Sequence, residues 1–455
     1  MSKGGKDENR PKIKISVLNL VVANVIFVGG SFSLEHNFLP EIVTSTFPVG
    51  EPFALAAGDF NGDSLPDLLL IAEANRPDIF GGIPNPNYEV RFYILIGQEN
   101  RSWALPRLVT VVPAPGKYAW VSSVSPAIDI DGDGNTDLAV VLTFLSVPQP
   151  SLPVDIQTAE TDLFLFWGQG DGSFTVEHKA RLGVGFLPPS VITVGDFNGD
   201  KLIDLAYPDP QNLSVQIMFN KGARNFSEPY IVQVASEEDE CMPIPGILAT
   251  AKLIEESVAD SLVILGPCKS DHDSYEQFIR FLWPDGDEAW KLSPVYKTGI
   301  ESKKLTEVAG NLLVGEYDGD GHVDLIFTKR LSFSGPSDTS AVPGIMGVYL
   351  LRGDGKGTFA TPMLIGGVFW GKLLSVQYKK SLGWNIITLS SDENAVQVVI
   401  VKPDSSYAAS LSIPIKGYVV DGIVVDWNNV REVVVISSLD LKSEVTVVQV
   451  IRGFP

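Results

Sequence analysis

The chain has 455 residues and a formal net charge of -21. It is too long for one ordinary compact core, so it must contain several domains or one large repetitive domain. The negative charge argues against nucleic acid as a partner, because phosphate binding requires clustered Lys and Arg, and it favours cations instead. Forty-two Gly and 31 Pro separate short apolar runs, a pattern typical of many short strands.

The N-terminus carries a targeting signal. Basic residues precede the apolar stretch ISVLNLVVANVIFVG, which begins at Ile15 and is followed by the small residues Gly30 and Ser31. This order predicts a secretory signal peptide within residues 1–35 and a secreted or cell-surface protein. An uncleaved anchor that attaches the chain to the membrane is a second interpretation, and an ordinary buried strand is a third.

Internal repeats predict the architecture. Four segments share an apolar run, an acidic Gly-containing loop, an Asp and a second apolar run, and their first acidic residues are Asp59, Asp129, Asp196 and Glu316. The first two intervals are about 70 residues and the third is about twice that, which indicates a hidden copy between them. Degenerate copies place Lys252, Gln377 and Asp426 at the first loop position, which makes seven units.

Each unit continues with further apolar strands and a polar turn, as in GQGDGSF ending at Phe174. This pattern predicts four antiparallel strands per unit and an all-β, seven-bladed β-propeller over residues 36–455. The last unit ends at Pro455, where its fourth strand should begin, whereas Phe38 to Pro52 forms a strand with no earlier blade. We therefore expect this N-terminal strand to pair with Val445 to Ile451 and close the ring.

The four loops have the composition of cation sites. Acidic or amide side chains at positions 1, 3, 5 and 9 turn their oxygens inward, and a backbone carbonyl near position 7 adds another ligand. A hard cation with six to eight oxygen ligands suits this set, and calcium suits it better than magnesium, so we predict about four calcium ions. The predicted ligand residues are Asp59, Asn61, Asp63, Leu65 and Asp67; Asp129, Asp131, Asp133, Asn135 and Asp137; Asp196, Asn198, Asp200, Leu202 and Asp204; and Glu316, Asp318, Asp320, His322 and Asp324.

The acidic loops have two alternative interpretations. An EF-hand requires a Glu at loop position 12, but Leu70, Val140, Tyr207 and Phe327 stand there, inside apolar strand runs. The other alternative is that Asp, Asn and Gly only form turns. Fourfold repetition of all four ligand positions argues against that.

The pattern D-F-N-G-D-x-x-x-D-L, followed by a Gly-Asp-Gly-x-Phe hairpin, resembles the FG-GAP repeat of integrin α-subunits and of related secreted bacterial and fungal propellers, including a lectin. The resemblance covers about residues 36–455. It implies a calcium-stabilised, non-catalytic binding or adhesion module that recognises a protein or glycan partner at the cell surface. A calcium-dependent lectin proper and a polysaccharide-degrading enzyme on the same scaffold are the alternatives, since fold alone does not assign function.

Other features carry less information. The chain contains no recognised catalytic motif, so we expect no enzyme. Arg352-Gly353-Asp354 spells an integrin-recognition tripeptide, but an equivalent turn at Gly170-Asp171-Gly172 indicates turn chemistry. We interpret Trp120, Trp384 and Trp427 as core residues, with a stacking platform for sugars as the alternative. Cys241 and Cys268 pair only if the compartment is oxidising.

Overall fold

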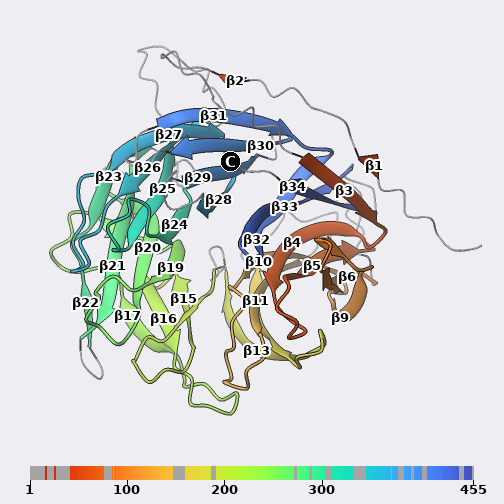
Figure 1. The fold of residues 1–455 in the computed structure, drawn as a ribbon. Helices are drawn as coiled ribbons and strands as arrows, with labels where there is room; N and C mark the ends of the chain where they lie inside the picture. The colour runs from red at the N-terminus through yellow and green to blue at the C-terminus, as the bar shows by residue number, and fades with distance from the viewer. Residues whose placement is uncertain are drawn as a thin grey trace, which may run out of the picture.

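The computed structural model describes residues 16–17, 25–26, 41–75, 85, 87–146, 159–185, 191–270, 274–285, 289–302, 310–330, 345–369, 371–377, 384–390, 394–401, 407–439 and 445–452. The described chain is all β, and seven antiparallel sheets radiate around a central axis (Figure 1). The predicted seven-bladed propeller is confirmed. Within the described residues, no helix is long and apolar enough to cross a membrane.

The blades follow the order of the predicted units, and each is built from its innermost strand outward. Blade 1 contains β4 (Glu51–Gly58), β5 (Asp67–Ala74), β6 (Glu89–Leu95) and β9 (Arg107–Pro113), with a small ribbon of β7 (Gly97–Gln98) and β8 (Ser102–Trp103); blade 2 contains β10 (Lys117–Val124), β11 (Leu138–Ser146), β12 (Glu160–Gly168) and β13 (Phe174–Val184); blade 3 contains β14 (Thr193–Gly195), β15 (Asp204–Asp209), β16 (Ser214–Met218) and β17 (Tyr230–Gln233).

Three of the remaining blades keep the same order. Blade 5 contains β24 (Leu312–Gly315), β25 (Asp324–Arg330), β26 (Ile345–Leu351) and β27 (Met363–Phe369); blade 6 contains β28 (Lys372–Gln377), β29 (Trp384–Ser390), β30 (Ala395–Val401) and β31 (Tyr407–Pro414); and blade 7 contains β32 (Tyr418–Trp427), β33 (Val430–Ser438), β34 (Thr446–Arg452) and β3 (Glu41–Phe47).

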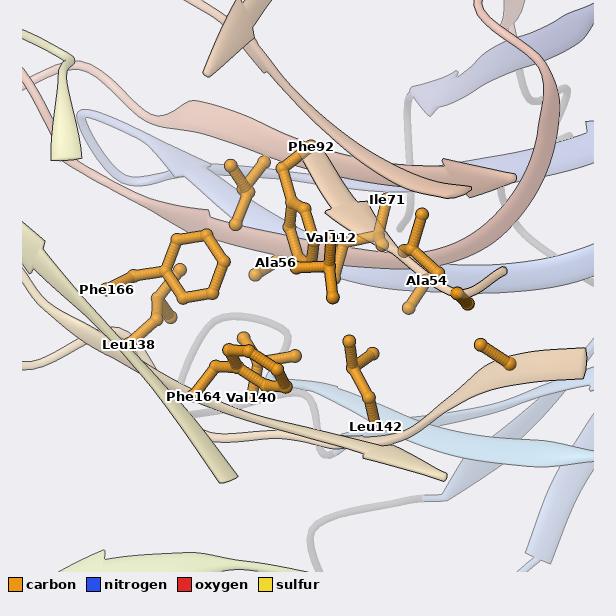
Figure 2. Close-up of a cluster of buried hydrophobic side chains, with 14 of the residues drawn as sticks. Ala54, Ala56, Ile71, Phe92, Val112, Leu138, Val140, Leu142, Phe164 and Phe166 are labelled. Carbon is orange, nitrogen blue, oxygen red and sulfur yellow. The ribbon is translucent and has the colours of Figure 1, made fainter. Parts of the chain in front are cut away.

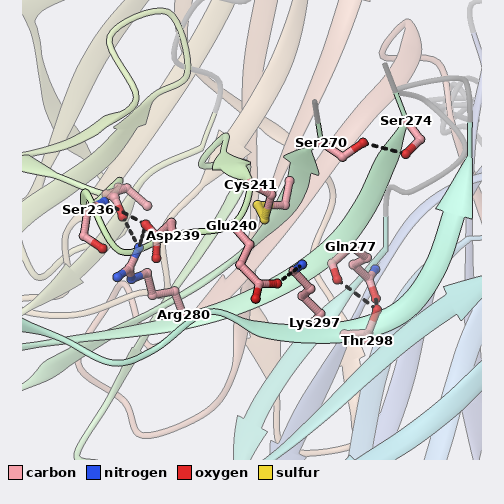
Figure 3. The surroundings of a disulfide bond; sticks show 12 residues. Ser236, Asp239, Glu240, Cys241, Ser270, Ser274, Gln277, Arg280, Lys297 and Thr298 are labelled. Atoms are coloured by element: carbon pink, nitrogen blue, oxygen red, sulfur yellow. Dashed lines mark hydrogen bonds and ion pairs between the residues drawn. A yellow bond between two sulfur atoms is a disulfide. The ribbon is translucent and has the colours of Figure 1, made fainter. Parts of the chain in front are cut away.

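Blade 4 departs from the predicted four strands, because its first and last strands are each divided in two. Its inner edge is divided into β18 (Met242–Pro243) and β19 (Ile247–Ala251), which both pair with β20 (Ser261–Lys269), and its outer edge into β22 (Trp290–Leu292) and β23 (Tyr296–Ser302), which both pair with β21 (Tyr275–Pro284). Pro245 and Pro294 lie at the two breaks, and proline cannot donate a ladder hydrogen bond. Cys241 and Cys268 form a disulfide that fastens the entry of β18 to β20 (Figure 3).

The N-terminal strand closes the ring, as predicted. β3 pairs with β34 over its whole length, from Glu41 opposite Arg452 to Phe47 opposite Thr446. The strand is shorter than the predicted segment, because Gly50 turns the chain with a φ of 113° and β4 of blade 1 begins at Glu51. A side chain at Gly50 would collide with the Glu73 carbonyl oxygen, so only glycine allows this turn.

Most of the predicted leader lies outside the described residues. Within it the structure describes β1 (Ser16–Val17), which pairs with β3, and β2 (Val25–Ile26), which pairs with β31. The signal peptide, the anchor and the strand therefore stay open as interpretations of residues 1–35.

Apolar side chains between neighbouring blades form the core. Figure 2 shows Ala56 and Phe92 of blade 1 opposite Val140 and Phe166 of blade 2. The second strand of each blade is covered on both faces, which explains uninterrupted apolar runs such as the fully buried β5. Burying each large side chain contributes about 1.5–3 kcal/mol relative to leaving it exposed, so the seams between blades hold the ring together.

Candidate metal centres

The four predicted loops occupy equivalent places in the ring. Each joins the innermost strand of its blade to the second strand, so all four emerge on the same face, which we call the loop face. The third-to-fourth strand hairpins emerge there too and contact the loop of the preceding blade. Gly172 of blade 2 donates its N–H to the Phe60 carbonyl oxygen at 2.9 Å, and Asn220 of blade 3 donates to the Ile130 carbonyl oxygen at 2.8 Å.

The first loop position organises the turn. One carboxylate, that of Asp59, accepts backbone N–H groups from Gly62, Asp63 and Ser64 at 2.7, 3.1 and 2.8 Å. Asp129 and Asp196 accept the equivalent three N–H groups in blades 2 and 3, and Glu316 accepts that of Gly319 in blade 5. The residue at position 4 is always glycine with φ between 77° and 89°, a conformation that favours glycine.

The fifth position is oriented by position 7. The N–H groups of Leu65, Asn135, Leu202 and His322 each donate at 2.8 Å to the carboxylate two residues earlier. The carboxylates at position 5, which are Asp63, Asp133, Asp200 and Asp320, remain exposed. A carboxylate at this position could therefore bind a cation from solvent without any change in the core.

The ninth position is a buried junction, a role that the sequence did not indicate. Asp67 is fully buried, and its two oxygens accept N–H groups from Phe60 at 2.9 Å and Gly97 at 2.7 Å, so it joins the loop to the strand that follows β6. Asp137, Asp204 and Asp324 are equally buried and make the equivalent pair of bonds, to Ile130 and Gly168, Phe197 and Asn220, and Tyr317 and Gly353.

Burial leaves these four carboxylates short of compensating charge. It raises the pKa of Asp67, Asp137 and Asp324 to about 6 and that of Asp204 to about 7, although the backbone N–H groups oppose the shift. Neighbouring loop carboxylates push the pKa values in the same direction as burial. A cation beside each carboxylate would favour its ionised form.

The carboxylates converge closely enough to share an ion. One oxygen from each of Asp129, Asp131 and Asp137 lies within 4.8 Å of the others, and the same holds for Glu316, Asp318 and Asp324. An asparagine stands at the third position in blades 1 and 3, so the corresponding three residues there supply two carboxylates and an amide. Oxygen donors in such a cluster fit a hard divalent cation.

The other sequence interpretations have mixed outcomes. Trp427 is buried and contacts Trp103 at 5.3 Å between ring centroids, as a core residue should. Trp120 is 40% exposed, so its interpretation as core is wrong, and the side chain of Trp384 lies outside the described residues. Asp354 accepts N–H groups from Lys356 and Thr358, which confirms that the Arg-Gly-Asp tripeptide is part of a turn.

No family model matches the chain. Among curated proteins, the chain is similar to the T-cell immunomodulatory protein of Homo sapiens, with 24% identity over 269 residues, which is 59% of this chain and 36% of that protein. The match therefore covers about a third of the human protein.

Among solved structures, the chain is similar to several distant ones. A putative 6-phosphogluconolactonase from Bacteroides uniformis is 13% identical, with 85% of this chain and 96% of that chain covered and a TM-score of 0.44. An α-L-arabinanase from Penicillium chrysogenum is 12% identical, with 88% and 93% covered and a TM-score of 0.42. A sialidase from Streptococcus pneumoniae is 10% identical, with 90% and 69% covered and a TM-score of 0.42.

Proposed function

We propose that this protein is a calcium-stabilised, non-catalytic binding propeller that acts outside the cytoplasm and recognises a protein or glycan partner. The observation that carries the proposal is the fourfold repetition of one loop geometry, in which an acid at position 1 caps the turn, an acid at position 5 stays exposed and an acid at position 9 is buried. Structural turns alone do not require three or four carboxylates in each loop.

The oxygens at positions 1, 3, 5 and 9 of blades 1, 2, 3 and 5 would hold the ions. Calcium accepts six to eight such ligands in flexible geometry, and extracellular modules commonly bind it at about 10⁻⁴–10⁻³ M. The bound ion would supply positive charge where carboxylates otherwise repel one another. Calcium at extracellular concentrations would fill sites of this affinity and stabilise the loops. This supports the proposed location outside the cytoplasm.

The face opposite the loops supports the proposal of a partner. Two large aromatic side chains, Trp120 near the start of β10 and Tyr418 at the start of β32, are 40% and 48% exposed there. Both strands line the central channel, which forms a cavity of about 820 Å³. The connections from Glu73 to Glu89 and from Ser146 to Thr161 leave from this face, although most of their residues lie outside the described chain. Exposed aromatic rings offer contact area to either a protein or a sugar.

A thermal melt with and without chelator tests the calcium proposal. Binding to the folded state alone raises stability by RT ln(1 + [L]/Kd), about 2.7 kcal/mol per site at a hundredfold excess over Kd. Chelation should therefore lower the melting temperature, and Asp133→Ala or Asp320→Ala should remove part of this dependence. The controls Lys252→Ala and Gln377→Ala, in loops that lack the acidic pattern, should retain it. A parent melt that ignores chelator overturns the calcium proposal.

Binding assays test the partner. A glycan array separates a lectin from a protein binder, and a pull-down from cell surfaces identifies a protein ligand. Turnover of a polysaccharide would contradict the non-catalytic proposal. Export is tested by mass spectrometry of the mature N-terminus, which should fall between about Gly29 and His36; an intact Met1 on protein recovered from cytosol contradicts it.

A further inference from the structure

We infer that Arg224 and Arg352 each neutralise an aspartate at the third loop position and so give all four candidate calcium sites the same net charge. The inference rests on the proposed calcium sites and concerns how their charge is set. Positions 1, 5 and 9 are acidic in all four loops, so the charge of the side-chain ligands differs only at position 3. Blades 1 and 3 carry Asn61 and Asn198 at position 3, whereas blades 2 and 5 carry Asp131 and Asp318.

In the two loops with asparagine at position 3, the asparagine itself makes both contacts to position 5, and no arginine of the described chain takes part. In blade 1, the Asn61 Oδ1 atom accepts the Asp63 N–H at 3.1 Å and its Nδ2 group donates to Asp63 Oδ2 at 2.9 Å. Asn198 makes the same two contacts with Asp200, at 3.0 and 3.0 Å. Among the described residues, no ion pair joins a Lys or Arg to any loop carboxylate of these two blades. Each loop therefore presents three carboxylates to an ion.

In blade 2 an arginine occupies the place of that amide donor. Asp131 keeps the backbone contact, because its Oδ1 atom accepts the Asp133 N–H at 3.1 Å. Its other oxygen, Oδ2, accepts a hydrogen bond from Arg224 Nε at 2.6 Å, and Arg224 Nη2 lies 3.6 Å from Asp133 Oδ2. The guanidinium thus bridges positions 3 and 5, as the asparagine amide does in blades 1 and 3.

Arg224 is held in this place by its surroundings. It belongs to the hairpin between β16 and β17 of blade 3, and its guanidinium lies over the buried ring of Trp167 in blade 2, 4.9 Å from the ring centroid. Lys179 donates to the Arg224 carbonyl oxygen at 3.1 Å. The buried Asn220, in the same hairpin, fastens it to blade 2 through the Ile130 carbonyl oxygen. The pair therefore also crosses the seam between blades 2 and 3.

Blade 5 reaches the same pairing by another route. Asp318 Oδ1 accepts the Asp320 N–H at 3.2 Å, and Asp318 Oδ2 lies 3.3 Å from Arg352 Nε. Arg352 follows β26 in the hairpin of the same blade, so it comes from a different place than Arg224. Two arginines from unrelated positions thus meet the only two aspartates found at position 3 of the four loops.

Charge matching explains this correspondence. Four carboxylates and one guanidinium in blades 2 and 5 carry the same net charge as three carboxylates and one amide in blades 1 and 3, namely three negative charges. A unit charge a few ångströms from a divalent cation in water-like dielectric changes affinity by about tenfold. The arginines therefore bring all four sites to a similar affinity.

A charge cycle at blade 2 tests this by calcium calorimetry on the full chain. Arg224→Gln should tighten one of the four sites by about tenfold and Asp131→Asn should weaken it by about tenfold. The double variant should return close to the parent. Lys221→Gln, which removes a positive charge from the same hairpin without touching the loop, is the matched control and should leave all sites unchanged. Terbium luminescence sensitised by Trp167, with Trp167→Phe as reference, assigns the altered site to blade 2.

The same variants in chelator give a readout that needs no metal. Arg224→Gln should lower the melting temperature, because Asp131 is left beside Asp129, Asp133 and Asp137, and the double variant should recover most of the loss. Weaker or unchanged calcium binding in Arg224→Gln overturns the inference while leaving the calcium proposal intact. A double variant whose melting temperature in chelator is no higher than that of Arg224→Gln does the same. A parent that binds no calcium overturns both.

Discussion

Blades 1 and 7 are neighbours in the ring, yet they join their first two strands in different ways. In blade 7, β32 ends at Trp427 and β33 begins at Val430, so the turn consists of Asn428 and Asn429 alone, with φ of 53° and 73°. Positive φ at both residues is characteristic of the type I′ turn that suits tight hairpins. In blade 1 the same junction consists of residues 59–66. Together with Asp67, the first residue of β5, it contains three acidic side chains.

The difference teaches what the acidic loops are not needed for. A two-residue turn closes the hairpin of blade 7 without a cluster of carboxylates, so propeller geometry alone does not demand the longer loop. At the seam, blade 7 instead pairs the fully buried Glu432 with two arginines, Arg101 at 2.9 Å and Arg452 at 3.1 Å. The acidic loops of blades 1, 2, 3 and 5 therefore need another explanation, and the proposed calcium sites supply one.

The largest effect on this pair of blades should come from removing the strand that joins them. Deleting residues 1–47 removes β3 and exposes the edge of β34, where seven residues of the ladder lose their partner. An open edge promotes pairing with other chains, so we expect aggregates or dimers in light scattering coupled to size exclusion. A synthetic peptide of residues 39–50 added in trans should restore the monomer. A truncated chain as monomeric and heat-stable as the parent contradicts the closure.

The second effect separates the buried acid of blade 1 from the exposed acid of blade 7. Asp67→Ala leaves the N–H groups of Phe60 and Gly97 without their acceptor, which should cost about 3 kcal/mol of unfolding free energy. Asp426→Ala removes a half-exposed acceptor of the Asn429 N–H and should cost at most about 1 kcal/mol.

Urea unfolding in chelator measures both variants without a contribution from calcium. Asp67→Asn keeps one acceptor oxygen and should fall between Asp67→Ala and the parent. Equal losses in Asp67→Ala and Asp426→Ala would show that the buried junction contributes no more than a surface turn.

The fold could be predicted from the sequence because each repeat is defined by residues that are close together in the chain. Acidic loops recur at a fixed spacing, and the degenerate copies around Lys252, Gln377 and Asp426 keep the apolar runs on either side. Ring closure followed from counting strands, since Phe38 to Pro52 had no blade and the last blade lacked a strand. The exact end of that strand depended on Gly50 and its contact with Glu73, which the sequence pattern does not reveal.

The site was only partly readable, because its remaining features are contacts between distant residues. Asp67 was identified as a possible ligand, but its bond to Gly97 depends on where the next strand passes. Arg224 lies 93 residues from Asp131, and nothing in the local pattern of either residue connects them. The extra acid at position 3 in blades 2 and 5 was the available signal, since an added buried charge calls for a partner.

The smallest effect sharpens the comparison at the turn itself. Asn429 has φ of 73°, which asparagine tolerates and a β-branched residue does not, so Asn429→Val should cost about 2 kcal/mol. Asn429→Gly should be close to neutral, because glycine adopts this conformation without strain. Since the turn at Asn428 and Asn429 replaces the acidic loop in blade 7, the loss in Asn429→Val should be the same in calcium and in chelator. Ser64→Val, at φ of 66° inside the loop of blade 1, is the matched variant, and its loss should be accompanied by weaker stabilisation by calcium. Thermal melts of both variants in the two buffers decide the matter, and an equal calcium response in the two would mean that the loops of blades 1 and 7 do not differ in the way their geometry indicates.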